Sequence, residues 1–158
     1  MDARLCRESK LRGEGKSLRT AFIICLGNPL RGDDAFGLLV FRLLRRLRLP
    51  VVYMGTAPEN IMNILSRVKP ELVIIVDALI EGGDGLIVSR LSNESDDTFV
   101  STHSLSLKLL FRLAGLEPEN IIVVGAKAGN LSVGDRPSER MRKLAVEAAS
   151  FIARRLTI

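Results

Sequence analysis

The chain has 158 residues, the usual length of one globular domain, with 47% hydrophobic and 26% charged residues. Two cysteines and one histidine exclude a disulfide framework and any zinc site built from several Cys and His ligands. The net charge of +5 makes nucleic acid a partner to consider. However, residues 1–19 hold six Lys and Arg against three Asp and Glu, which accounts for +3 of that excess, and we expect no nucleic-acid partner.

The polar composition of residues 1–19 predicts a flexible basic tail, followed by a single α/β domain over residues 20–158. No apolar run has the length and position of a secretory signal or of a membrane-spanning helix. We therefore expect a cytoplasmic protein that does not bind membranes.

Short runs rich in Ile and Val alternate with amphipathic helical patterns along the chain. In order, the sequence predicts a strand over 21–26, a helix over 36–49, a strand over 50–54, a helix over 57–68, strands over 71–77 and 85–91, a helix over 104–114, a strand over 120–125 and a helix over 138–156. Strand 85–91 alternates in polarity, as an edge or antiparallel strand does. This order predicts a mostly parallel sheet with helices on both faces.

Two helix starts carry recognisable polar residues. Thr56 and Glu59 have the spacing of a capping box for helix 57–68. Asp33 and Asp34 precede helix 36–49, where one aspartate is expected as an N-cap. Capping does not require the second, which is free to face a cleft.

The candidate functional residues follow the strands, since functional sites in open α/β sheets lie at the carboxyl ends of strands. Asp34 follows the first strand, Asp77 ends an apolar strand and His103 precedes a helix. A lone histidine is usually an ordinary surface residue. Together, however, these three side chains offer nitrogen and oxygen ligands suited to nickel, zinc or manganese. Alternatively, the two carboxylates act as an acid/base pair.

Other common sites are not supported by the sequence. The loop after the first strand has neither the glycine spacing of a dinucleotide site nor the Gly-Lys-Ser/Thr of a phosphate-binding loop, and two aspartates would repel a phosphate. Cys25 lies within an apolar run and is expected to be a small buried side chain, not a nucleophile.

At these residues the sequence resembles the maturation endopeptidases of nickel–iron hydrogenases. The resemblance extends from about residue 22 to 151 and rests on Gly27-Asn28-Pro29-Leu30-x-x-Asp33-Asp34-x-x-Gly37, Gly55-Thr56-Ala57-Pro58-Glu59-Asn60, Val76-Asp77-Ala78 and Thr102-His103. The Ala-Pro-Glu-Asn segment is similar to the branch that processes formate-hydrogenlyase-type hydrogenases.

The resemblance implies a fold, an activity and a site. The fold is a three-layer α/β/α sandwich of the phosphorylase/hydrolase-like kind, on a five-stranded mostly parallel sheet with one antiparallel strand. The activity is removal of the C-terminal extension from the hydrogenase large-subunit precursor after nickel insertion. Asp34, Asp77 and His103 bind nickel supplied by the precursor, and no organic cofactor is involved. The chain departs from the family pattern at Ala35, where glycine is frequent, and in lacking a proline in residues 125–130.

How the peptide bond is attacked stays open, because either a metal-polarised carbonyl or a carboxylate-activated water fits these residues. Three rival functions also remain. A peptidyl-tRNA hydrolase shares the Leu-Gly-Asn-Pro turn at residues 26–29, but its catalytic histidine follows that turn, where this chain has Asp33 and Asp34. A nickel chaperone would use the same ligands without cutting. A flavin or nucleotide site is disfavoured by the acidic loop.

Overall fold

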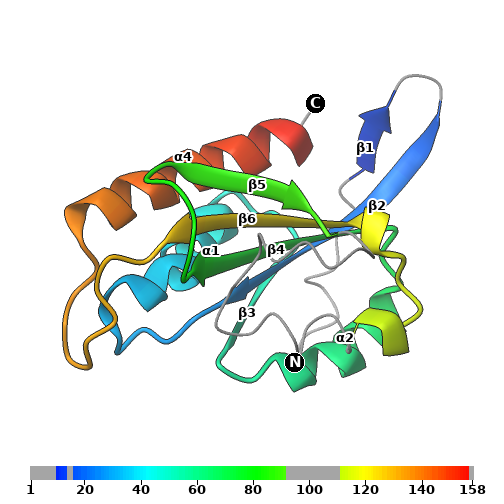
Figure 1. Cartoon of the computed structure of the whole chain (residues 1–158). Helices are drawn as coiled ribbons and strands as arrows, with labels where there is room; N and C mark the ends of the chain where they lie inside the picture. Colours follow the sequence, from blue (N-terminus) through cyan, green and yellow to red (C-terminus); the bar gives the residue numbers. More distant parts are fainter. Residues whose placement is uncertain (1–9, 14–15, 92–110, 157–158) are drawn as a thin grey trace.

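A mostly parallel sheet forms the centre of the molecule (Figure 1) in a computed structural model that describes residues 10–13, 16–91 and 111–156. Within this part, the strands of the main sheet lie in the order β3-β2-β4-β6-β5 and are β2 (Lys16–Leu26), β3 (Val51–Gly55), β4 (Leu72–Leu79), β5 (Leu86–Arg90) and β6 (Ile121–Lys127). All neighbours are parallel except β5, which runs antiparallel to β6. The predicted five-stranded sheet with one antiparallel strand is confirmed.

Helices cover both faces of the sheet, which explains why the central strands read as continuous apolar runs. On one face, α1 (Phe36–Arg46) and α4 (Glu139–Leu156) pack against Ile23 and Cys25 of β2. On the other face, α2 (Ile61–Val68) and Phe111 pack against Ile24. The three-layer α/β/α architecture is therefore confirmed. Most of the predicted helix over 104–114 lies outside the described residues. The described part of it, residues 111–113, is helical.

Two helices differ from their predicted bounds for local reasons. Helix α1 ends at Arg46 because Arg48 takes a left-handed conformation with φ 58°, whereas the sequence predicts continuation to residue 49. Before α2, Pro58–Asn60 form a short 3-10 turn, so the helix begins at Ile61 and no side chain caps its N-terminus. The predicted capping box of Thr56 and Glu59 is therefore wrong.

The N-terminal segment also differs from the expected tail. Strand β1 (Lys10–Gly13) pairs antiparallel with the first part of β2, and the hairpin extends away from the main sheet (Figure 1). Since these residues have no apolar periodicity, their pairing depends on backbone hydrogen bonds that a side-chain pattern does not reveal. Residues 1–9 lie outside the described part of the chain.

A helix that spans a membrane has to be both long and apolar. In residues 10–13, 16–91 and 111–156, no helix has both the length and the apolar character that crossing a bilayer requires.

Candidate active site

The loop between β2 and α1 places two aspartates over the carboxyl end of β2. Gly27 leaves the strand with φ 127°, and the 3-10 turn Gly32–Ala35 then leads directly into α1. Gly37 lies so close to β2 that a Cβ atom there would be 1.8 Å from the Leu26 carbonyl oxygen. Ala35 has φ −72°, so the glycine frequent in the family at this position is not needed for the backbone.

Asp34 has one carboxylate oxygen held by the loop and one left over. Its side chain is 3% exposed, and Oδ2 accepts the Asn28 N–H at 3.0 Å. Oδ1 is buried and has no hydrogen-bond partner among the described residues. A buried carboxylate oxygen without a donor is costly in free energy. This oxygen is therefore suited to bind a cation that a ligand brings into the site.

Asp77 lies in β4, fully buried and opposite Gly125 of β6. Burial raises the pKa of the Cys25 thiol in the neighbouring strand β2, and the nearby Asp77 charge raises it further. Asp34 acts similarly on Tyr53 of β3, whose pKa is raised by burial first and then by the Asp34 charge. Since Tyr53 and Cys25 are paired in the sheet, both carboxylates flank the end of β2.

These observations place two of the three candidate residues in one region. The 3-10 turn that carries Asp34 contacts β4, which carries Asp77. The third candidate, His103, lies outside the described residues. Among residues 10–13, 16–91 and 111–156, no three His, Cys, Asp or Glu side chains are placed to hold a metal ion.

Cys25 is not available as a nucleophile. Its side chain is completely buried in the core between the sheet and helices α1 and α4. Burial and the nearby Asp77 charge both raise the pKa of its thiol, which disfavours the reactive thiolate. The structure agrees with the prediction that Cys25 is a buried apolar residue.

Asp33 has a structural role that the sequence did not reveal. Its Oδ2 accepts the N–H groups of Gly129 and Asn130, at 2.8 and 3.2 Å, and its Oδ1 accepts the Ser138 N–H at 2.7 Å. Burial alone would raise its pKa, but hydrogen bonds from the backbone and hydroxyl of Ser138 and from the Gly129 and Asn130 amides outweigh this and lower the pKa.

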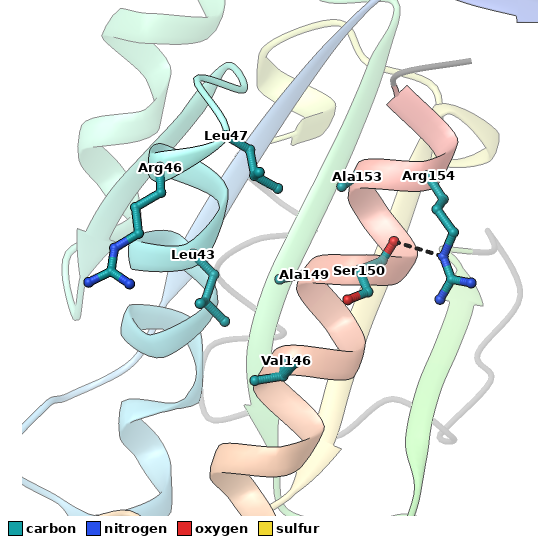
Figure 2. A pocket seen from close by; sticks show the side chains of 8 residues that line it. All are labelled: Leu43, Arg46, Leu47, Val146, Ala149, Ser150, Ala153 and Arg154. Carbon is teal, nitrogen blue, oxygen red and sulfur yellow. Dashed lines mark hydrogen bonds between the residues drawn. The ribbon is translucent and has the colours of Figure 1, made fainter.

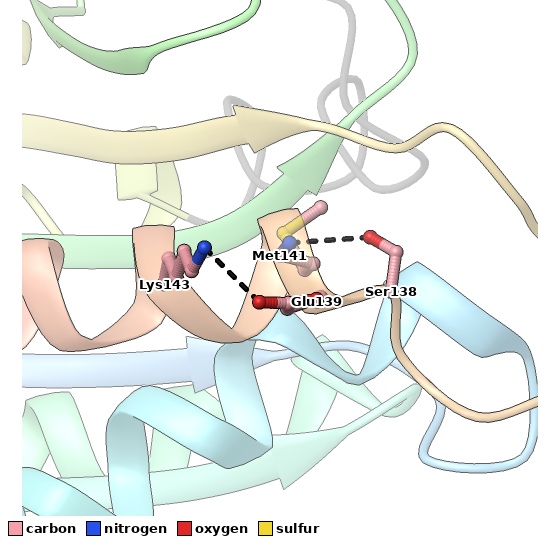
Figure 3. Close-up of polar contacts among 4 residues, drawn as sticks. All are labelled: Ser138, Glu139, Met141 and Lys143. Carbon is pink, nitrogen blue, oxygen red and sulfur yellow. Dashed lines mark hydrogen bonds and ion pairs between the residues drawn. The ribbon is translucent and has the colours of Figure 1, made fainter.

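Asp33 thereby helps to cap a helix distant in the sequence. Ser138 Oγ accepts the Met141 N–H at 3.1 Å at the start of α4 (Figure 3), while Asp33 accepts the Ser138 N–H. In a capping box, that second acceptor is an acidic side chain within the same helix. The expectation that one aspartate caps its own helix is wrong, since no side chain caps the 3-10 turn or α1. Its contacts are 96 to 105 residues away, so no local pattern signals them.

A surface groove elsewhere on the molecule is separate from these carboxylates. It lies between the second halves of α1 and α4 (Figure 2), whereas the aspartates precede the first turn of α1. Its lining residues are Leu43, Arg46, Leu47, Val146, Ala149, Ser150, Ala153 and Arg154. No Asp, Glu, His or Cys side chain lines it, so it does not offer the chemistry of the candidate site.

Comparison with known proteins supports the resemblance in sequence and in fold. No family model matches the chain. A protein of Methanocaldococcus jannaschii, provisionally named a hydrogenase maturation protease, is 29% identical over 123 residues, which cover 70% of this chain and 73% of that protein. The crystal structure of the nickel–iron hydrogenase maturation protease HycI from Thermococcus kodakarensis is 28% identical with a TM-score of 0.70, covering 87% of this chain and 92% of that one.

Two further structures are similar in fold. HybD, a nickel–iron hydrogenase maturation protease from Thermococcus kodakarensis, has a TM-score of 0.73 and is 23% identical, with 86% of this chain and 98% of that one covered. The hydrogenase maturating endopeptidase HybD from E. coli has a TM-score of 0.70 and is 18% identical, with 87% and 91% covered. In sequence and in fold, the chain is similar to the nickel–iron hydrogenase maturation proteases, the family that its motifs resemble.

Proposed function

We propose that this chain is an endopeptidase that removes the C-terminal extension of a nickel–iron hydrogenase large-subunit precursor once nickel has been inserted. The observation that carries the proposal is the pair of buried carboxylates, Asp34 and Asp77, beside the end of β2 in a relative of maturation proteases. The buried Oδ1 of Asp34, which has no donor among the described residues, is costly in free energy unless a cation or a proton offsets it. A metal ion on the substrate would supply that positive charge.

In this proposal, nickel belongs to the substrate and is bound by Asp34, Asp77 and His103. The unpartnered Oδ1 of Asp34 is the first oxygen available to it. When bound, the metal supplies positive charge that can polarise a carbonyl or a water molecule. Three ligands from this chain leave coordination positions open for the ligands of the precursor itself. Cleavage would therefore depend on nickel having been inserted.

The chain's own residues would fix the geometry of this step. The Asn28 N–H orients the Asp34 carboxylate by holding Oδ2. The Tyr53 hydroxyl donates to the Gly27 carbonyl oxygen at 2.5 Å and so fixes the start of the same loop. In the alternative in which the two carboxylates act as an acid/base pair, one of them would take a proton from water. In either route water attacks the carbonyl carbon of the peptide bond: the metal would polarise that carbonyl, or a carboxylate would take a proton from the water.

The test is incubation of the full chain with a nickel-loaded large-subunit precursor, followed by intact mass spectrometry. We expect loss of the C-terminal extension with the wild type, and at least a hundredfold slower loss with Asp34→Asn, Asp77→Asn or His103→Ala. The exposed Glu147 on α4 supplies a control, Glu147→Gln, which should cleave at the wild-type rate. A precursor that lacks nickel should remain intact.

The same experiment separates the non-cutting alternative. A nickel chaperone would bind the loaded precursor, and lose binding in the same three variants, but the precursor mass would not change. Normal cleavage by His103→Ala and Asp34→Asn would contradict the assigned site. The formate-hydrogenlyase branch is a further part of the proposal, which a comparison of precursors from different hydrogenase types would decide.

A further inference from the structure

Two loops distant in the sequence join at the edge of the sheet beside Asp34. The loop after β2 and the loop after β6 lie side by side at one end of the molecule (Figure 1). Three backbone hydrogen bonds link them, namely Gly134 N–H to the Leu30 oxygen at 2.8 Å, Gly32 N–H to the Asp135 oxygen at 3.2 Å and Asp33 N–H to the Asn130 oxygen at 2.8 Å. The Asp33 carboxylate accepts three more hydrogen bonds, from the N–H groups of Gly129, Asn130 and Ser138.

Side chains within the loops hold them further. Asn130 Oδ1 accepts the Ser132 N–H at 2.9 Å, and its amide donates to Asp135 at 2.6 Å. Asn28 Oδ1 accepts the Leu30 N–H at 2.9 Å. The paired loops therefore form a preorganised surface, which costs little conformational entropy when a partner binds.

This surface exposes two large apolar side chains. Leu30 is 66% exposed and Val133 is 78% exposed. Val133 directly precedes the Gly134 N–H that binds the Leu30 oxygen, so the two residues belong to neighbouring segments. A single exposed apolar side chain is ordinary, but two on a fixed backbone beside the same carboxylate offer contact area to a protein that reaches it.

Asn28 connects the exposed apolar pair to the candidate site. Its N–H binds the Asp34 carboxylate, and its side-chain oxygen binds the Leu30 N–H. A partner that contacts Leu30 is therefore connected to Asp34 through only two hydrogen bonds, both made by Asn28. Since both aspartates are buried, a protein substrate needs contact area outside the pair of carboxylates to be held against them.

We propose that Leu30 and Val133 form the docking surface for the large-subunit precursor, and that an apolar segment of the precursor covers them. This inference rests on the proposed function, whose substrate it places on the molecule. Apolar contacts at the centre of an interface supply much of the binding free energy. The two side chains would therefore set the affinity for the precursor without taking part in the chemistry.

The test compares the double variant Leu30→Ser/Val133→Ser with Leu47→Ser/Val146→Ser, which removes an equally sized exposed pair at 57% and 54% exposure from α1 and α4. Affinity for the nickel-loaded precursor is measured directly by calorimetry, and cleavage is measured as KM and kcat. We expect the first variant to weaken Kd and raise KM by about tenfold or more with kcat unchanged. The second should match the wild type in all three.

The outcomes separate this inference from the proposed function. Unchanged Kd and KM in Leu30→Ser/Val133→Ser, or equal losses in both double variants, would overturn the docking surface while leaving the endopeptidase intact. If the wild type binds without cutting, and only Leu30→Ser/Val133→Ser weakens Kd, the docking surface stands and the endopeptidase fails. Absence of binding by the wild type would overturn both. The thermal unfolding of each variant confirms that it is folded.

Discussion

The adjacent aspartates Asp33 and Asp34, in the loop between β2 and α1, have different contacts. Asp33 is fully engaged by N–H groups of a distant loop, while Asp34 keeps one buried oxygen without a donor among the described residues. The sequence predicts that one of the two aspartates is structural, and Asp33 has that role; that the other faces a cleft stays a prediction. The sequence assigns the structural one to the wrong helix, because only the folded chain brings residues 129–138 to Asp33.

Replacing Asp33 should loosen the loops without removing a proposed nickel ligand. Asp33→Asn places an amide against backbone donors and should lower the free energy of unfolding at pH 7 by about 1–3 kcal/mol. Because the folded pKa of Asp33 lies below its ordinary value of 3.8, the stabilisation is complete above that value and is lost as the pH falls through the folded pKa. Urea unfolding of both proteins from pH 7 to pH 3 measures this.

The matched control is the exposed Asp84, where Asp84→Asn should leave the unfolding free energy within about 0.5 kcal/mol of the wild type. Hydrogen exchange offers a second readout, since Asp33→Asn should speed exchange at the Gly129, Asn130 and Ser138 amides. A constant stability difference across the pH range would show that the Asp33 charge is not what holds the loops.

Whole elements were predictable where the apolar pattern reports burial. Continuous apolar runs located β2, β4 and β6, which are covered on both faces, and helically spaced apolar residues located α1 and α4. Ends were less predictable, as Arg48 shows: a left-handed residue stops α1 although no glycine stands there. The polar β1 hairpin carries no such pattern.

The start of α4 offers a test of capping at the scale of one element. Ser138→Ala removes the hydroxyl that accepts the Met141 N–H and should cost about 1 kcal/mol of stability. The Asp33 bond to the Ser138 backbone survives this change. Ser150→Ala, at an exposed position in the middle of α4, should be neutral or slightly stabilising.

A double-mutant cycle joins this change to Asp33→Asn. Both groups act at the same helix end, so the combined loss measured by thermal or urea unfolding should differ from the sum of the single losses by about 0.5 kcal/mol or more. Strict additivity would mean that the two caps are independent. A Ser138→Ala protein as stable as the wild type would contradict the role of the hydroxyl.

At the scale of the molecule, the parallel sheet explains why the sequence alone predicts that scattered residues lie close together. Strand-end positions meet at one edge, and the turn that carries Asp34 indeed contacts β4, which carries Asp77. Leu30 and Val133 could not be predicted in this way, because an exposed apolar residue in a loop has no sequence signature. Their proximity depends on hydrogen bonds across about 100 residues of chain, such as that between Gly134 and Leu30.

Basic residues of the β1 hairpin and the candidate site lie at opposite ends of β2. Lys10 and Arg12 belong to β1 and Lys16 and Arg19 to the first part of β2, whereas Asp34 follows the other end of that strand. Ten steps along a strand separate Lys16 from Leu26, or roughly 33 Å. The basic residues of the described hairpin are therefore far from the two carboxylates.

This separation predicts that the chain does not hydrolyse peptidyl-tRNA. With an N-acetylated aminoacyl-tRNA as substrate, we expect no release of the amino acid above the uncatalysed rate, measured by acid precipitation. Any tRNA retained should be released steeply by salt, as for contacts with phosphate alone, and retention should be the same for Asp34→Asn. If the wild type hydrolyses this substrate and Asp34→Asn does not, the carboxylates belong to a tRNA site and not to a precursor site, and the assignment is overturned.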